Sequence, residues 1–247
     1  NRLMSLSNPA RLFTHAPAGN TESDLHGNIG MTVTHDLASR VAQIDSSQGG
    51  GLSYSVAYQY NNNGQRVLKQ VLSAKRCIGL PGRPQACTPL VFHSTIFVYD
   101  QAGLLLGEYD ANTGAVKREY VWLQGMPVAV LDGAPARGAV YYIQTDHLDT
   151  PRVLIDRDGR QRWSWIADPF GNSTPVENPI GVGAFQFDLR MPGQYWDRES
   201  GLAYNWNRSY DPGLGRYTQS DPIGLAGGIN TYAFVENDPV SAFDPSG

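Results

Sequence analysis

The sequence predicts an all-β protein built as an array of β-hairpins, and a repeated unit is the first reason. In this unit an aromatic residue or His is followed by Asp or Asn, two or three small residues, Gly, and then a residue that opens a strand. The clearest copies lie at 60–71, 99–109 and 109–122. The step from Asp or Asn to Gly encodes a tight turn, because Gly readily adopts the positive φ that such turns need.

Composition and polarity patterning are the second reason for the all-β prediction. Aromatic residues make up 11% of the chain and include 13 Tyr, whereas 27 Gly and 16 Pro interrupt it often. The stretches 66–71 and 117–122 alternate in polarity with period two, which is typical of half-buried strands. One hairpin cannot bury its apolar face alone, so neighbouring hairpins must stack. The nearest helical candidate is 35–45, and there too the pattern favours a strand.

The chain divides into two parts in composition, with a boundary near residue 165. Residues 1–165 carry the repeats, including a copy at 35–41 that lacks its Gly and one at 156–165 that lacks its Tyr. A Cys-, Pro- and Gly-rich insertion at 73–93 interrupts them. Residues 166–247 are denser in Gly, Pro and Asp and depart from simple repetition.

Charge and apolar content exclude several classes of protein. The 247 residues carry a net charge of −4 without a run of Lys or Arg, so the basic surface of a nucleic-acid binder is missing. No stretch reaches the roughly 18–20 apolar residues of a membrane helix. The sequence begins at Asn1 with no signal peptide, and we expect it to be a fragment of a longer product.

The two cysteines, Cys77 and Cys87, leave two alternatives open. The Gly- and Pro-rich loop between them could close a disulfide hairpin, or both thiols could stay reduced at the surface. Zinc is not expected, because further ligands are missing nearby. We expect no metal and no cofactor.

The last fifty residues carry a family resemblance. Residues 197–239 include the stretch GRYTQSDPIG at 215–224, and the chain ends in PVSAFDPSG at 239–247. These residues resemble the RHS-associated core of the RHS/YD-repeat family, to which the C component of insecticidal Tc toxins is related. The repeats resemble the family's YD repeats over most of the chain.

The resemblance implies part of a spiral shell or cage, closed by a C-terminal core that turns inward as a plug. It implies a bacterial polymorphic toxin that encapsulates an effector encoded after this core, is cytoplasmic before export, and is then secreted or delivered into a target cell by type VI secretion or a related route. The expected partners are the remaining N-terminal shell and the toxin of the same polypeptide, together with a secretion-apparatus or chaperone protein.

The resemblance also implies self-cleavage. The family's core ends in the pattern P-x-x-x-x-D-P-x-G-L, which Pro239, Asp244, Pro245 and Gly247 match, and the terminal leucine would stand at position 248. In the family, cleavage follows that leucine. Asp221 and Asp244, each in a D-P-x-G unit, would then form an aspartyl-protease-like pair that acts once.

The chemistry of such a pair is sound. Two carboxyl groups in one site do not both ionise easily, so one can act as a base while the other donates a proton. Arg216, just before the first unit, is a candidate for orienting a carboxylate. The competing interpretation is an ordinary turn, since Asp-Pro-x-Gly also forms turns. Other Asp-Pro pairs, at Asp211 and Asp238 among them, are expected to be structural.

Two further groups of residues have a functional and a structural interpretation. Asp146, His147 and Asp149 could suggest a metal site or a triad, but no nucleophile motif accompanies them, and we expect them to be structural. Five aromatic residues could form a carbohydrate platform, or could fill a sheet face, which we favour: Trp163, Trp165, Trp196, Tyr204 and Trp206. A carbohydrate- or cell-surface-binding module without catalysis is the alternative function.

Overall fold

The structure is a computed structural model that describes residues 2–27, 29–48, 54–78, 86–133 and 138–247, with side chains throughout except at 48, 73–78 and 86–92. The all-β prediction is confirmed, because these residues form eighteen strands. The helices that they form are two 3-10 turns, Gly224–Gly227 and Val235–Asn237. No helix among the described residues is long and apolar enough to cross a membrane.

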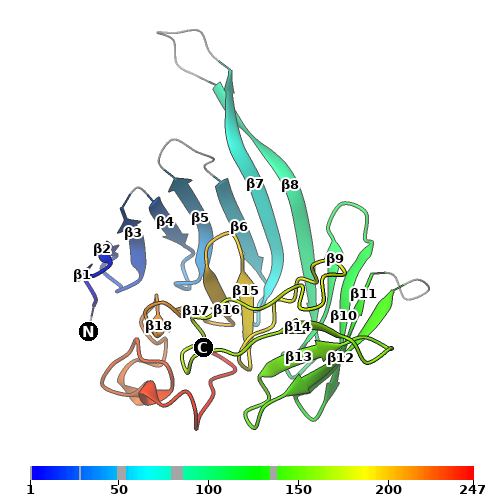
Figure 1. Cartoon of the computed structure of the whole chain (residues 1–247). Helices are drawn as coiled ribbons and strands as arrows, with labels where there is room; N and C mark the ends of the chain where they lie inside the picture. The colour runs from blue at the N-terminus through cyan, green and yellow to red at the C-terminus, as the bar shows by residue number, and fades with distance from the viewer. Residues whose placement is uncertain (1, 28, 49–53, 79–85, 134–137) are drawn as a thin grey trace. The chain divides into compact units, whose positions relative to one another are not determined.

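The strands form two sheets, and each sheet follows the order of the chain (Figure 1). The larger sheet has fourteen strands: β1 (Ser5–Ser7), β2 (Ala10–His15), β3 (Thr21–His26), β4 (Ile29–His35), β5 (Val41–Gln48), β6 (Tyr54–Tyr60), β7 (Arg66–Ile78), β8 (Ala86–Tyr99), β9 (Leu105–Asp110), β10 (Val116–Leu123), β11 (Met126–Asp132), β12 (Ala139–Thr145), β13 (Pro151–Ile155) and β14 (Gln161–Ser164). The smaller sheet contains β15 (Gln194–Asp197), β16 (Leu202–Asn205), β17 (Arg208–Asp211) and β18 (Arg216–Tyr217). This is the hairpin array that the repeats predict.

Contacts group the chain into two compact units, Asn1–Thr95 and Ile96–Gly247. In the first unit, one face of the strands is buried through Phe13, Val33, Ile44 and Val56. The expected boundary near residue 165, which rested on composition, stays a prediction. Everything that concerns the candidate site lies in the second unit.

The repeated unit of the sequence is a turn closed by a side chain. In the copy at 109–122, Oδ1 of Asp110 accepts from the backbone N–H groups two and three residues later, at 3.0 and 2.9 Å. In five other copies the first Asp or Asn accepts hydrogen bonds through Oδ1 from the backbone N–H groups two and four residues later, at 2.8–3.0 Å. These five begin at Asp36, Asn61, Asp100, Asp146 and Asp156. The fourth position has a positive φ, held by Gly in three copies and by Ser39 (64°) and Asp149 (63°) in the others. The copies without Gly therefore keep the same turn.

The stretch at 35–45 is not helical. It consists of the end of β4, the turn that begins at Asp36, and the start of β5. The insertion at 73–93 falls largely on the ends of β7 and β8, which are 13 and 14 residues long and extend beyond their neighbours as a hairpin (Figure 1). The proposed pair Cys77 and Cys87 lies outside the described side chains.

The core of the second unit joins the two sheets. After β14 the chain returns across the larger sheet, where Phe185 packs on Tyr141 and Phe187 on Trp163, with ring centroids 4.1 and 5.2 Å apart. The buried carboxylate of Glu108 in β9 accepts a hydrogen bond from Tyr195 in β15 at 2.9 Å. These contacts hold β15–β18 in place against the β9–β14 portion of the sheet.

Candidate functional site

The short strand β17 opens with a buried arginine, Arg208, whose side chain is only 5% exposed. Its guanidinium carbon lies 3.6 Å from the ring centroid of Tyr217 in β18, and its Nη1 donates to the carbonyl of Thr231 at 3.2 Å. A guanidinium stacked on an aromatic face is both attracted to the ring and restricted in direction. The second terminal nitrogen, Nη2, is thereby left to face the carboxylates.

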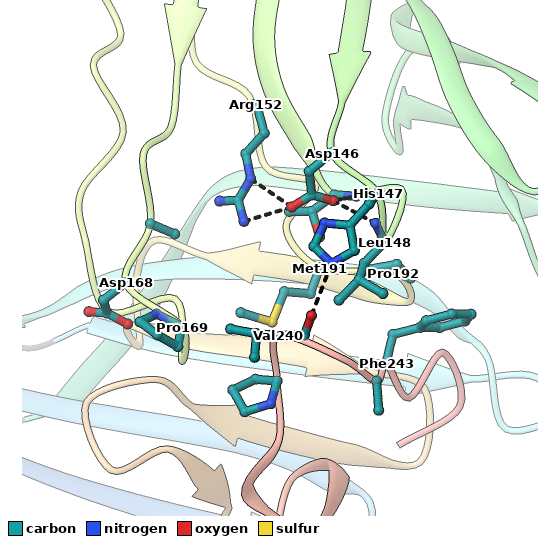
Figure 2. Close-up of a pocket in the computed structure, with 14 residues that line it drawn as sticks. Asp146, His147, Leu148, Arg152, Asp168, Pro169, Met191, Pro192, Val240 and Phe243 are labelled. Carbon is teal, nitrogen blue, oxygen red and sulfur yellow. Dashed lines mark hydrogen bonds and ion pairs between the residues drawn. The ribbon is translucent and has the colours of Figure 1, made fainter.

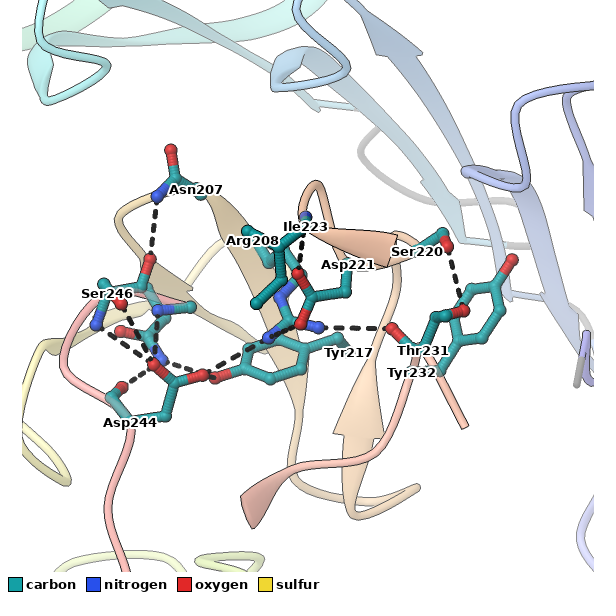
Figure 3. A network of polar contacts seen from close by, with 12 residues as sticks. Asn207, Arg208, Tyr217, Ser220, Asp221, Ile223, Thr231, Tyr232, Asp244 and Ser246 are labelled. Carbon is teal, nitrogen blue, oxygen red and sulfur yellow. Dashed lines mark hydrogen bonds and ion pairs between the residues drawn. The ribbon is translucent and has the colours of Figure 1, made fainter. Parts of the chain in front are cut away.

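Arg208 brings together the two aspartates that the sequence singles out. Its Nη2 lies 3.1 Å from Oδ2 of Asp221 and 3.3 Å from Oδ2 of Asp244 (Figure 3). Both distances are measured from the same nitrogen atom, so the two carboxylate oxygens are no farther apart than the sum of these two distances. The polar contacts that the structure gives for residues 205–247 join the two carboxylates through this cation and include no direct hydrogen bond between them.

In each of these aspartates one carboxylate oxygen accepts hydrogen bonds within its own turn and the other faces Arg208. Oδ1 of Asp221 accepts from the N–H of Ile223 at 2.9 Å. Oδ1 of Asp244 accepts from the N–H groups of Ser246 and Gly247 at 3.2 and 2.9 Å. Oδ2 of each faces Arg208. The turn and the site are therefore compatible interpretations of one Asp-Pro-x-Gly unit, and the sequence presented them as alternatives.

A phenol and an amide complete the surroundings of Asp244. The hydroxyl of Tyr217 donates to Oδ2 of Asp244 at 2.8 Å, and Nδ2 of Asn205 donates to that hydroxyl at 2.8 Å and to the carbonyl of Asp244 at 2.9 Å. Tyr217 and Asn205 are almost fully buried. Burial, and then the negative charge of Asp244, raise the pKa of the Tyr217 phenol well above its ordinary value. The phenol therefore stays a donor at neutral pH.

Gly247 fits its place for a steric reason. Its φ is 68°, and a Cβ added there would lie 2.0 Å from the carbonyl oxygen of Asn205 and 3.2 Å from the backbone nitrogen of Arg208. Of the other residues in the expected cleavage motif, Pro239 is buried and Pro245 is exposed. The backbone of Pro245 passes so close to Gly193 that a Cβ at Gly193 would lie 2.3 Å from its carbonyl oxygen.

Arg216, the arginine chosen from the sequence, lies elsewhere. Its guanidinium carbon is 4.8 Å from the ring centroid of Tyr232, and burial lowers its pKa. The ion pairs that the structure shows for Asp221 and Asp244 come from Arg208, which the sequence analysis did not single out. One signal could have found it, since an arginine at the start of a strand rich in buried residues needs a charged partner.

The cluster at 145–151 forms one of the repeated turns. Burial raises the pKa of Asp146, but hydrogen bonds from Thr150 and Leu148 and the nearby Arg152 outweigh it and hold that pKa below its usual value. His147 is exposed, and its Nε2 lies 2.9 Å from the carbonyl oxygen of Val240 beside a cavity of about 140 Å³ (Figure 2). Among the described residues no group of His, Cys, Asp and Glu is arranged to hold a metal ion.

The five aromatic residues of the carbohydrate platform do not act as one surface. Trp163 and Trp165 are 0% and 1% exposed, so they fill the core as the favoured interpretation predicts. Tyr204 and Trp206 line a pocket of about 470 Å³ together with Trp122.

Comparison with known proteins places the chain in a family. The sequence profile described as "RHS protein" matches residues 140–177. The chain is 31% identical to Toxin protein Tse5 of Pseudomonas aeruginosa over 230 residues, which cover 88% of this chain and 17% of Tse5. This chain belongs to the RHS family. The resemblance drawn from its C-terminal motifs and its repeats is thereby confirmed.

Other RHS relatives and a solved structure extend the comparison. Double-stranded DNA deaminase toxin A of Burkholderia cenocepacia is 27% identical over 95% of this chain and 17% of its own length. The crystal structure of TcdB2-TccC3 matches with a TM-score of 0.60 at 16% identity, over 96% of this chain and 13% of that one. The chain thus has the fold of RHS toxin-like proteins and spans less than a fifth of the relatives named here.

Proposed function

We propose that this RHS segment is part of a toxin-enclosing shell and that it cuts its own polypeptide just after position 248, using Asp221 and Asp244. The observation that carries the proposal is the joint contact of both carboxylates with Arg208. Asp221 lies in the loop that follows β18. Asp244 lies in the final segment of the chain, which returns to the same cation. Two carboxyl groups gathered on one buried cation support a shared site better than two independent turns.

The proposed reaction is the hydrolysis of one peptide bond. One carboxylate accepts a proton from a water molecule while the oxygen of that water attacks the carbonyl carbon of residue 248. The other carboxyl group, protonated, donates to the leaving nitrogen as the C–N bond breaks. The products are a carboxylate at position 248 and a free amino group on the released segment.

The charges of the cluster are compatible with one carboxylate acting as the base and the other carboxyl group acting as the acid. One guanidinium faces two carboxylates, so a single proton can reside on the pair without leaving Arg208 unpaired. Because substrate and site belong to one chain, the effective concentration of the scissile bond is high. One turnover is enough, so the rate need not be high.

The shell function rests on the kinship. Relatives named as toxins share this segment at identities of 27% and 31%, while the segment spans 17% of each. A segment common to different toxins suits a carrier better than an effector. Its partners would be the preceding shell and the following toxin of the same polypeptide, with a chaperone or secretion component. The protein would be delivered from a bacterium, with type VI secretion as the route.

The test is the intact mass of the full-length parent polypeptide, compared with its Asp221→Asn and Asp244→Asn variants. We expect the wild type to appear as two fragments that divide after position 248, and both variants to stay whole. Cleavage of all three alike would assign the cut to another residue or protease. A wild type that stays whole would remove self-cleavage from the proposal.

One observation favours a second candidate, a carbohydrate-binding module. The pocket of about 470 Å³ combines Trp122, Tyr204 and Trp206 with the polar Gln124 and Asp149. Aromatic faces flanked by such groups suit a sugar ring. Tryptophan fluorescence titrations with oligosaccharides, using the wild type and Trp206→Ala, would test it, and a response lost in the variant is the supporting result.

A further inference from the structure

We propose that Tyr217 and Asn205 are positioning residues of the cleavage site, which hold the backbone and the side chain of Asp244 in place. This inference rests on the proposed self-cleavage and adds to it the two residues that prepare one of the carboxylates. Neither of them needs to touch the scissile bond.

A chain of hydrogen bonds links Asn205, Tyr217 and Asp244. The amide of Asn205 donates to the hydroxyl of Tyr217, and that hydroxyl donates to Oδ2 of Asp244 (Figure 3). The same amide nitrogen reaches the carbonyl oxygen of Asp244 at 2.9 Å. The carbonyl can only accept, so the nitrogen of the amide must face it. Asn205 therefore holds both the backbone and, through Tyr217, the side chain of Asp244.

Asn205 and Tyr217 are more deeply buried than the side chain of Asp244. Asn205 is 0% and Tyr217 1% exposed, while the side chain of Asp244 is 23% exposed. The donors lie on two strands of the smaller sheet, whereas Asp244 belongs to a terminal stretch without regular secondary structure. A rigid, buried pair thus restrains a less confined carboxylate, which is how a supporting layer of residues fixes a site.

The groups that contact Asp244 hold its side chain unequally. Asp244 faces Arg208 from β17 and Tyr217 from β18, and Asp221 contacts the same nitrogen of Arg208. Within its own turn Asp244 accepts from the backbone of Ser246 and Gly247. The contact with Nη2 of Arg208 is long at 3.3 Å, whereas the contact with Tyr217 is 2.8 Å. The phenol therefore holds Oδ2 of Asp244 more closely than the guanidinium does.

The fold offers a matched control in Tyr210. It packs with Tyr217 and Phe234 in one buried cluster, is 1% exposed, and donates its hydroxyl to the carbonyl of Phe170 at 2.9 Å. Tyr210→Phe and Tyr217→Phe thus each remove a hydroxyl from the same core. The hydroxyl of Tyr217 is the one that reaches Asp244.

The experiment measures the rate of self-cleavage of the full-length parent after its release from denaturant, beside its thermal unfolding temperature. We expect Tyr217→Phe to slow cleavage by about tenfold or more, as for the loss of a hydrogen bond to a charged group. We expect Tyr210→Phe to slow it less than about twofold, with a similar loss of stability. A slower rate at matched stability separates a positioning role from a merely structural one.

A second variant keeps the inference testable if Tyr217→Phe folds poorly. Asn205→Ala removes the first link of the same hydrogen-bond chain, so the double variant should be slowed less than the product of the two single effects. Equal slowing by Tyr217→Phe and Tyr210→Phe would overturn the positioning role. A wild type that does not cleave would instead refute the proposed function, and the two failures are distinguishable.

Discussion

Removal of Arg208 is the sharpest test of the site as a buried ion cluster. Arg208→Gln leaves two carboxylates close together in a pocket where their side chains are only 11% and 23% exposed. Loss of one partner from a buried ion pair costs about 3–5 kcal/mol. We take the low end, about 3 kcal/mol, because Asp244 still reaches solvent.

The matched control is Arg160→Gln. Arg160 pairs with Asp158 at 2.8 Å, but both side chains are more than 60% exposed. Such surface pairs contribute about 0–1 kcal/mol. Both variants replace one charged arginine by Gln, but Arg208 is buried and contacts two carboxylates, whereas Arg160 is exposed and contacts one.

The assay is denaturant unfolding followed by tryptophan fluorescence. All five Trp lie in the unit Ile96–Gly247, so the signal reports the unit that holds the site. An equal loss of stability in Arg208→Gln and Arg160→Gln would refute the cluster.

Three further predictions follow from named contacts. Gly247→Ala should slow self-cleavage of the parent by more than about tenfold, because the added Cβ meets backbone at 2.0 Å, whereas Gly201→Ala, where φ is also positive but an added Cβ meets nothing within 4 Å, should change the rate little; intact mass against time measures both. Burial raises the pKa of Tyr120 and Tyr195, so the folded protein favours their protonated phenols. The stability of the fold should therefore fall as the pH rises above about 10, the ordinary pKa of tyrosine in the unfolded chain. Phenolate absorbance should then appear together with unfolding and not before it. His147→Phe should increase proteolysis near Val240 while His147→Gln keeps an N–H donor and stays protected, and equal digestion of the two would remove the role of that hydrogen bond.

Local features of the fold could be predicted from the sequence because they are encoded within five residues. The hydrogen bonds that close each repeated turn start from one Asp or Asn and end on its near neighbours. Even the copy without Gly keeps the turn, since Ser39 adopts the positive φ at a cost of roughly 1 kcal/mol. The pattern therefore predicts hairpins wherever the side-chain acceptor is present.

The basic residue of the site could not be predicted in this way. Arg208 and Arg216 both lie close to the first D-P-x-G unit in sequence. Strand pairing decides between them, because it sets Arg208 opposite Asn205 and Arg216 opposite Asp211. The contact of Arg208 with Asp244 also spans 36 residues and depends on the return of the final segment. No local pattern encodes either event.

The Asp-Pro turns at Asp168 and Asp244 differ in the contacts of the second carboxylate oxygen. Oδ1 of Asp168 accepts from the N–H groups of Phe170 and Asn172 at 2.9 and 3.1 Å, much as Oδ1 of Asp244 accepts from its own turn. The local geometry is alike, so the turn itself does not distinguish them. Asp244 differs because its second oxygen meets a buried guanidinium and a buried phenol. The proposed chemistry would thus depend on the β16–β18 strands that receive the turn, and we expect Tyr217→Phe to slow the proposed cleavage while the turn stays formed.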